Sequence, residues 1–116
     1  MNARDAQTPA TDEGRVEAQI QAKGLTAPRL TPGWIDDVIH GAAYHVFGDT
    51  CLTVCCLTLR NGFTVTGESA CASPENFDAK LGEEIAYRNA RDKIWALEGY
   101  LLKERLSYGG TKGEVA

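Results

Sequence analysis

The stretch that decides the fold runs from Leu52 to Thr66 and reads LTVCCLTLRNGFTVT. Its first eight residues, Leu52 to Leu59, interleave Leu and Val with Thr and Cys, which is typical of a strand. Asn61-Gly62 follows at once, and a second strand-like run begins at Phe63. Asn-Gly between two such runs is the strongest short hairpin signal, because both turn positions of the tightest hairpins need positive φ. The sequence therefore predicts an antiparallel hairpin.

The residues before this stretch predict a short helix and then a strand. Thr31 can cap a helix start, and Pro32 suits the first helical position. Four apolar residues then share one helical face: Trp34, Ile35, Val38 and Ile39. We expect this helix to end near His40-Gly41, and residues 44–47 to form a strand that ends at a Gly48-Asp49 turn.

The residues after the hairpin predict a long helical segment. We expect residues 67–72 to leave the sheet, Ser73-Pro74 to start a helical turn and Asp78 to act as a second cap. From Ala79 to about Leu106 apolar residues recur at helical spacing: Ala86, Ala90, Ile94, Leu97 and Leu101. Gly99 costs about 1 kcal/mol against Ala inside a helix, which predicts a kink or break near Glu98-Gly99.

A stripe of minimal side chains on this helix bears on assembly. Gly82, Ala86 and Ala90 are spaced by four, so another element can approach the helix closely. That element is either the protein's own sheet or the same helix of a second subunit. A three-stranded sheet has few ways to cover both faces with so short a chain, which favours a homo-oligomer.

These elements predict an α+β fold, with a short antiparallel sheet of about three strands centred on the Asn-Gly hairpin, an N-terminal helix and a long C-terminal helical segment. A chain of 116 residues supports one domain, which we place at residues 31–107. Residues 1–30 are interpreted as a flexible arm with a short helix over 16–23, and residues 108–116 as a flexible tail.

The charge pattern weighs against two classes of partner. Net charge is −4 without a long basic run, whereas double-stranded nucleic acid and anionic membranes need a concentrated positive surface. No stretch approaches the roughly 20 apolar residues of a membrane span, and no secretory signal begins the chain. Between Thr31 and Phe77 the only Lys or Arg is Arg60, whereas residues 78–106 hold six. A site for a small anion should therefore draw on this last segment.

The sequence lacks the common motifs of catalytic sites. It has no Gly-rich phosphate loop and no nucleophile elbow. His40 and His45 do not share a helical face, so ordinary partly buried histidines are favoured over a metal site with Cys51. All four cysteines are expected to be free thiols: Cys51, Cys55, Cys56 and Cys71. Cys55 and Cys56 are adjacent in a strand and should point to opposite faces of the sheet. The sequence thus predicts a binding protein without metal or cofactor, not an enzyme.

One group of residues near the start of the long helix suits ligand binding. Phe77 can stack on a base, Arg88 can hold a phosphate and the Asn89 amide can read polar edges. Residue type equally fits a structural interpretation, in which Phe77 packs in the core, Asn89 satisfies backbone groups and Arg88 is solvated. The choice depends on whether these side chains converge.

Several motifs together resemble a widespread family of small tailed-phage proteins. They are NGFTVTGESAC at 61–71, PENFD at 74–78 and KIWALEGY at 93–100, with Gly82, Ala86 and Ala90 between them. The resemblance covers about Thr31 to Leu106. It is specific because the three motifs occur together and in this order.

By this resemblance, the family looks like the one that includes the type I Thoeris anti-defence proteins. Those are phage "sponges" that sequester the cyclic ADP-ribose isomer made by bacterial TIR immune enzymes; some also hold cyclic oligonucleotides of the CBASS pathway, and they form dimers that build hexamers. The resemblance implies a homo-oligomer in the host cytoplasm that binds a cyclic ADP-ribose-type signal, or cyclic di- or trinucleotides, without cleaving it.

The resemblance also implies a pocket between subunits, with an aromatic ring on adenine and basic groups at the pyrophosphate. By motif position, Phe77 is the stacking residue and Asn89 the polar reader. Arg88 and Arg60 are the anion contacts, with Arg105 from the last helix of either subunit as a further one.

Two other interpretations stay open. A phage protein-interaction module that inhibits a host factor is favoured by the small-residue stripe and by aromatic residues such as Tyr100 and Tyr108. An enzyme acting on nucleotides would rest on Cys55, His45 and the acidic residues.

Overall fold

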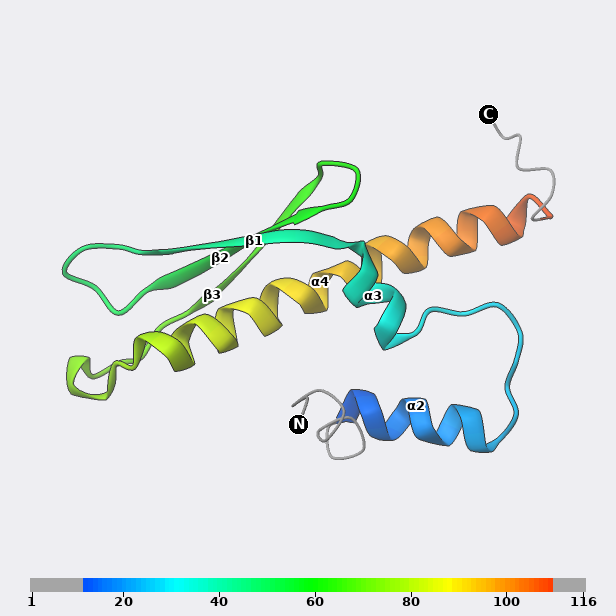
Figure 1. Ribbon diagram of the computed structural model, residues 1–116, viewed down its shortest axis with the longest axis horizontal. Coiled ribbons are helices and arrows are strands. Elements are labelled where there is room, and N and C mark those ends of the chain that lie inside the picture. The colour runs from blue at the N-terminus through cyan, green and yellow to red at the C-terminus, as the bar shows by residue number, and fades with distance from the viewer. Residues whose placement is uncertain (1–11, 110–116) are drawn as a thin grey trace.

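The computed structural model describes residues 12–109 and has the predicted α+β fold (Figure 1). Its elements follow the chain as α2 (Asp12–Ala22), α3 (Pro32–Val38), β1 (Ile39–Val46), β2 (Thr53–Leu59), β3 (Thr64–Ser69), the 3-10 helix η2 (Pro74–Asn76) and α4 (Ala79–Ser107). The strands form one antiparallel sheet in the order β1-β2-β3. Residues 1–11 of the expected arm and 110–116 of the expected tail lie outside the described residues.

The central hairpin is confirmed, but its turn differs from the expected one. The Leu59 N–H donates to Phe63 O at 2.7 Å, so three residues form the loop instead of two. Gly62 has φ of 92°, whereas Asn61 is not among the residues with positive φ. Asn61 Oδ1 instead accepts from the Phe63 N–H at 3.0 Å. The glycine therefore takes the left-handed position that closes a three-residue hairpin loop, and the asparagine side chain braces it.

Both predicted helix caps are present. Thr31 Oγ1 accepts from the Trp34 N–H at 3.1 Å at the start of α3. Asp78 Oδ1 accepts from the Leu81 N–H at 2.9 Å at the start of α4. Each side chain satisfies an amide that the first turn of a helix leaves unpaired.

The junction of α3 and β1 lies earlier than predicted. α3 ends at Val38, and β1 begins directly with Ile39. The strand expected at 44–47 therefore begins five residues earlier than predicted. The reason is long-range pairing, which places Ile39 opposite Leu59 of β2, with an irregular register between Ile39 and Gly41.

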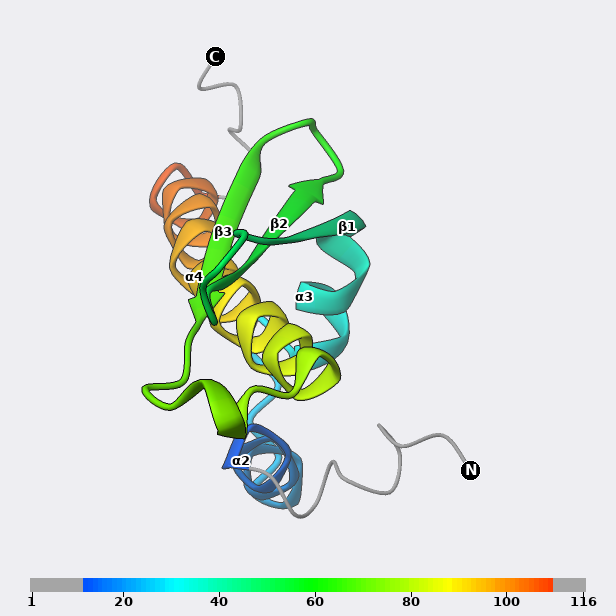
Figure 2. The ribbon, with the colours of Figure 1, turned by 90° about the vertical axis from the view of Figure 1, so that its left-hand side faces the viewer.

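α4 packs across β2 and β3 (Figure 2). Its predicted small-residue stripe faces them, with Gly82 near Thr53 and with Ala86 and Ala90 near Gly67. Ala86, Ala90 and Ile94 are fully buried. The closest approach is at Gly67, where an added Cβ would lie 2.8 Å from Ala90 Cα and closer still to other backbone atoms of α4. The stripe therefore contacts the protein's own sheet, the first of the two alternatives. β3 extends to Ser69, so the expectation that residues 67–72 leave the sheet is wrong for its first part.

α4 runs unbroken from Ala79 to Ser107, so the kink or break predicted near Glu98-Gly99 is wrong. Tertiary contacts hold the helix on both sides of the glycine. Ile94 is fully buried, and Glu98 Oε1 accepts from Trp34 Nε1 at 2.8 Å. These contacts offset the cost of about 1 kcal/mol for a helical glycine.

The helices leave one face of the sheet open. All the described helices lie on the same side of the sheet (Figures 1 and 2). The register places small, polar and thiol side chains on the other face: Ala43, His45, Val54, Cys56, Thr58, Thr64, Thr66 and Glu68. The molecule is elongated, with extents of 54 × 35 × 24 Å.

α2 lies on the opposite side of α3 and α4 from the sheet (Figure 1). The short helix expected over 16–23 is present, but it begins at Asp12. Glu13 Oε2 joins it to α4 by accepting from Arg91 at 2.7 Å and from Trp95 Nε1 at 3.0 Å. Arg91 also donates to Asp36 at 2.9 Å. Burial acts to lower the pKa of Arg91, but its hydrogen bonds to Glu13 and Asp36 raise it above the ordinary value.

The approach of Gly67 to α4 gives the first prediction. Gly67→Ala should lower the free energy of unfolding by at least about 3 kcal/mol, because the added methyl group meets helix backbone, which cannot rotate away. Gly41→Ala in β1 is the matched control, since nothing lies within 4 Å of its Cβ position. It should stay within about 1 kcal/mol of the unchanged protein. Equal losses in urea unfolding would contradict this packing.

The ion pairs of Arg91 give a second prediction. Arg91→Met should lower the free energy of unfolding by about 2 kcal/mol, because it leaves the partly buried Glu13 and Asp36 carboxylates without this cation. The exposed Lys93→Met, two residues further along α4, should change it by less than about 0.5 kcal/mol. Urea denaturation of both variants checks this difference.

Candidate functional site

An open hollow of about 580 Å³ lies where the sheet ends and α4 begins. It is lined by the β1–β2 loop and by the residues after β3: Asp49, Thr50, Cys51, Leu52, Ala70, Cys71, Ala72, Pro74 and Phe77. η2 places Phe77 there, because the Phe77 N–H donates to Pro74 O at 3.1 Å. The ring is half-buried, and the volume is in the range of small-molecule sites. The structure therefore puts the predicted stacking residue at a hollow and not in the core.

The charged groups around this hollow are acidic. Asp49 lines it, Glu75 lies near Cys51, and Asp78 caps α4 directly after Phe77. Among the described residues no Lys or Arg lines the hollow. A bound anion would therefore need positive charge from another part of the assembly.

Asn89 and Arg88 lie on α4 about 15 Å beyond its start, at 1.5 Å per residue. Asn89 Nδ2 donates to Glu68 O of β3 at 2.8 Å, which is the structural role weighed for it above. The residue is nevertheless exposed, as is Arg88. Neither lines the hollow beside Phe77.

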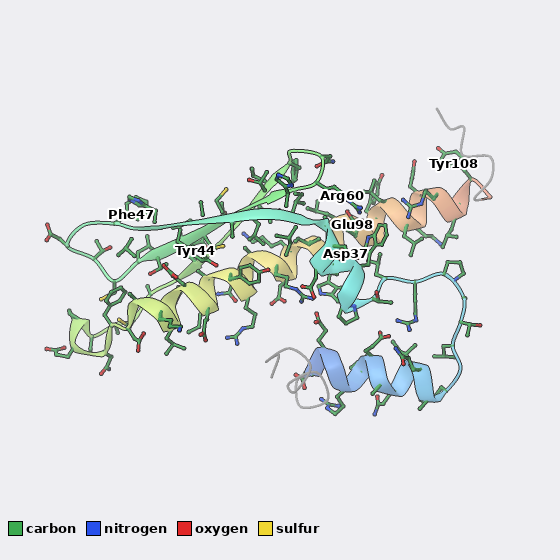
Figure 3. The ribbon with its side chains drawn as sticks, in the orientation of Figure 1. Asp37, Tyr44, Phe47, Arg60, Glu98 and Tyr108 are labelled. Carbon is green, nitrogen blue, oxygen red and sulfur yellow. The ribbon has the colours of Figure 1, made fainter. Side chains whose placement is uncertain are left out.

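Arg60 lies in the hairpin loop, about 26 Å along β2 from Leu52 at 3.3 Å per residue. Its guanidinium lies 5.0 Å from the centre of the Trp34 ring, whose Nε1 donates to Glu98. Figure 3 shows Arg60 and Glu98 at the end of the sheet away from Phe47. Arg60 thus contacts an aromatic face in its own chain.

Arg105 lies in the last turn of α4, about 39 Å from the start of the helix. It is exposed. The five predicted residues are therefore spread over the length of the molecule and do not form one site within a single chain. Sequence could place each on an element but could not show this separation.

Tyr44 of β1 is not among the site residues predicted from the sequence. It stands opposite Cys55 in the register, with Glu83 and Tyr87 of α4 nearby. Burial, followed by these neighbours, raises the pKa of Tyr44 to about 12. Burial also raises the pKa of the Cys55 thiol. Figure 3 shows Tyr44 between β1 and α4. The alternation of side chains between the two faces of β1 could have predicted that Tyr44 faces α4.

The histidines do not form the weighed metal site. His45 packs edge-on against Phe47, with ring centroids 4.5 Å apart. Within residues 12–109 no group of three or more His, Cys, Asp or Glu side chains is placed to hold a metal ion. In the same part of the chain no helix combines the length and apolar character needed to cross a bilayer.

A second hollow, of about 470 Å³, lies in the loop after α2. Among the residues that the structure describes, Arg29 is the only charged one that lines it. Arg29 forms two hydrogen bonds with Glu17, at 2.7 and 2.9 Å, and they lower the pKa of that carboxyl. The cation is therefore already paired, and the Phe77 hollow is the better candidate.

The position of Tyr44 predicts a pH dependence. The folded state holds its proton up to about pH 12 and the unfolded chain only to about pH 10, so the free energy of unfolding should fall as pH rises from 10 to 12. Tyr44→Phe should remove this slope and the tyrosinate absorbance step near pH 12, read after a rapid pH jump. Tyr100→Phe is the control, because Tyr100 is 71% exposed. An unchanged step in Tyr44→Phe would contradict the assignment.

Comparison with known proteins identifies the family of the chain. The family model that matches is described as Phage protein (N4 Gp49/phage Sf6 gene 66) family, and it covers residues 30–106. No curated protein and no solved structure matches the chain. The matched range runs from the residue before the Thr31 cap almost to the end of α4 and so includes the whole sheet. The chain belongs to this family of phage proteins.

Proposed function

We propose that this phage protein binds and sequesters a cyclic ADP-ribose-type immune signal in the host cytoplasm, without cleaving it. The observation that carries the proposal is the half-buried Phe77 ring at an open hollow of about 580 Å³. An aromatic ring at such a hollow can stack on adenine, and stacking contributes about 1–3 kcal/mol per base. The volume suits a nucleotide-sized ligand, including the cyclic di- and trinucleotides considered above.

The charge distribution favours a site completed by a second copy. A pyrophosphate beside Asp49 and Glu75 alone would be repelled. Arg88 and Arg105 are exposed, and they are too far along α4 to serve the hollow of their own chain. In the proposed assembly these arginines, with Arg60, approach the Phe77 hollow of a neighbouring copy.

The uncovered face of the sheet also favours assembly of several copies. It carries few charged groups and is covered by none of the described helices. A second copy on this face would bury it and bring two sets of strand ends together. We propose dimers that build a hexamer on this basis, together with the resemblance described above.

The test is retention of an unmodified ligand. Purified full-length protein is incubated with cyclic ADP-ribose isomers or cyclic oligonucleotides, and native mass spectrometry reports bound ligand and subunit number together. We expect one ligand class to be retained by an oligomer and released chemically intact on heating. Phe77→Ala should weaken binding by about 10- to 100-fold, which corresponds to the loss of stacking.

Phe63→Ala is the matched control, because Phe63 is 55% exposed, directly follows the hairpin loop and lies outside the hollow. It should retain the ligand as the unchanged protein does. No retention of any cyclic nucleotide at micromolar protein would refute the proposal. A single stoichiometric host protein captured instead would favour the interaction-module alternative, and a chemically altered ligand would favour the enzyme.

A further inference from the structure

Cys51 lies two residues before the first paired residue of β2, and Cys71 lies two residues after the last paired residue of β3. The register places Thr53 opposite Ser69 and Val54 opposite Glu68. Continued by two residues on each strand, it places Cys51 opposite Cys71.

Two further observations bring these thiols together. Both cysteines line the hollow that contains Phe77, and both are partly exposed. The Cys71 sulfur donates to Ser73 O at 3.3 Å. The neighbouring Cys71 side chain raises the pKa of the Cys51 thiol, and burial adds to the effect.

The other two cysteines do not compete for this pairing. Cys55 and Cys56 are adjacent in β2 and point to opposite faces of the sheet, as predicted. Cys55 is fully buried beneath α4, and Cys56 is on the open face. Neither lines the hollow.

We propose that Cys51 and Cys71 form a redox-active dithiol site that closes to an intramolecular disulfide by exchange with small-molecule disulfides such as oxidised glutathione. Facing residues of a sheet have Cβ atoms about 4.5–5.5 Å apart, and a disulfide needs about 3.8 Å. The approach of about 1 Å is available because the β2–β3 pairing ends at Thr53 and Ser69, so the ladder does not hold either cysteine.

The reaction is two successive thiol–disulfide exchanges. The Cys71 thiolate attacks one sulfur of the small disulfide, whose S–S bond breaks, and one thiol molecule leaves. Cys51 loses its proton to solvent and attacks the Cys71 sulfur, and the second thiol molecule leaves. The two cysteines are oxidised, the small disulfide is reduced, and the two cysteine protons balance the two thiols released.

Closure would change the hollow, since the bond joins its two walls beside Phe77. The dithiol therefore reacts with small-molecule disulfides, a class of reactant that is separate from the nucleotide ligand proposed above. Because the exchange needs no nucleotide, it can be tested whether or not the protein is a sponge.

The test counts the thiolates released by a limiting amount of a chromogenic aromatic disulfide. Reduced full-length protein should release two coloured thiolates per reagent molecule, because the mixed disulfide on one cysteine is resolved by the other. Cys51→Ser and Cys71→Ser should each release one and retain the adduct, a twofold drop. Cys56→Ser should behave like the unchanged protein.

Alkylation and mass spectrometry then locate the bond. A Cys51–Cys71 bond within a monomer-sized chain, with the remaining two cysteines alkylated, is the expected result. One thiolate per reagent molecule in the unchanged protein would overturn the proposal. So would a bond between chains or a bond involving Cys55 or Cys56.

Discussion

The contact between Gly67 of β3 and the backbone of α4 at Ala86 and Ala90 is the constraint on which the rest of the structure depends. Only a residue without Cβ lets a strand lie this close to a helix. The small residues of α4 complete the approach, with Gly82 packed against Thr53 of β2. Helix and sheet are thereby fixed in one relative position, and the core between them is thin but fully buried at its centre.

The place of α4 also determines what remains exposed. The helix contacts β2 and β3 far more than β1, so Tyr44 and Val46 on the helix side of β1 stay partly accessible. The opposite face of the sheet has no cover within the described chain. α3 and α2 extend the helical layer instead, and α2 is joined to it through Glu13 and Arg91. Residues 12–109 thus cover one face of the sheet only.

The hollow beside Phe77 follows from the same arrangement. The chain leaves β3 after Ser69, turns through η2 and enters α4 at the Asp78 cap, so the strand ends and the helix start enclose an open space. Its lining combines one aromatic ring, two thiols and an acidic residue. Positive charge lies elsewhere, on α4 and in the hairpin loop. The proposed ligand site therefore needs two copies for an electrostatic reason, not only a steric one.

The sequence by itself determined the elements whose causes are local. The Asn61-Gly62 hairpin, the Thr31 and Asp78 caps and the apolar stripe of α4 each depend on a few neighbouring residues. All are present, although Leu101 at the end of the predicted stripe is 46% exposed. Only the tertiary structure decided where α3 gives way to β1, that Gly99 stays helical and that Gly67 stays in the sheet, because distant partners outweigh local preference there. It also decided which candidate side chains lie together, since convergence depends on how the elements pack. Phe77 joined Cys51 and Cys71 at one hollow, and Arg60 and Arg105 did not.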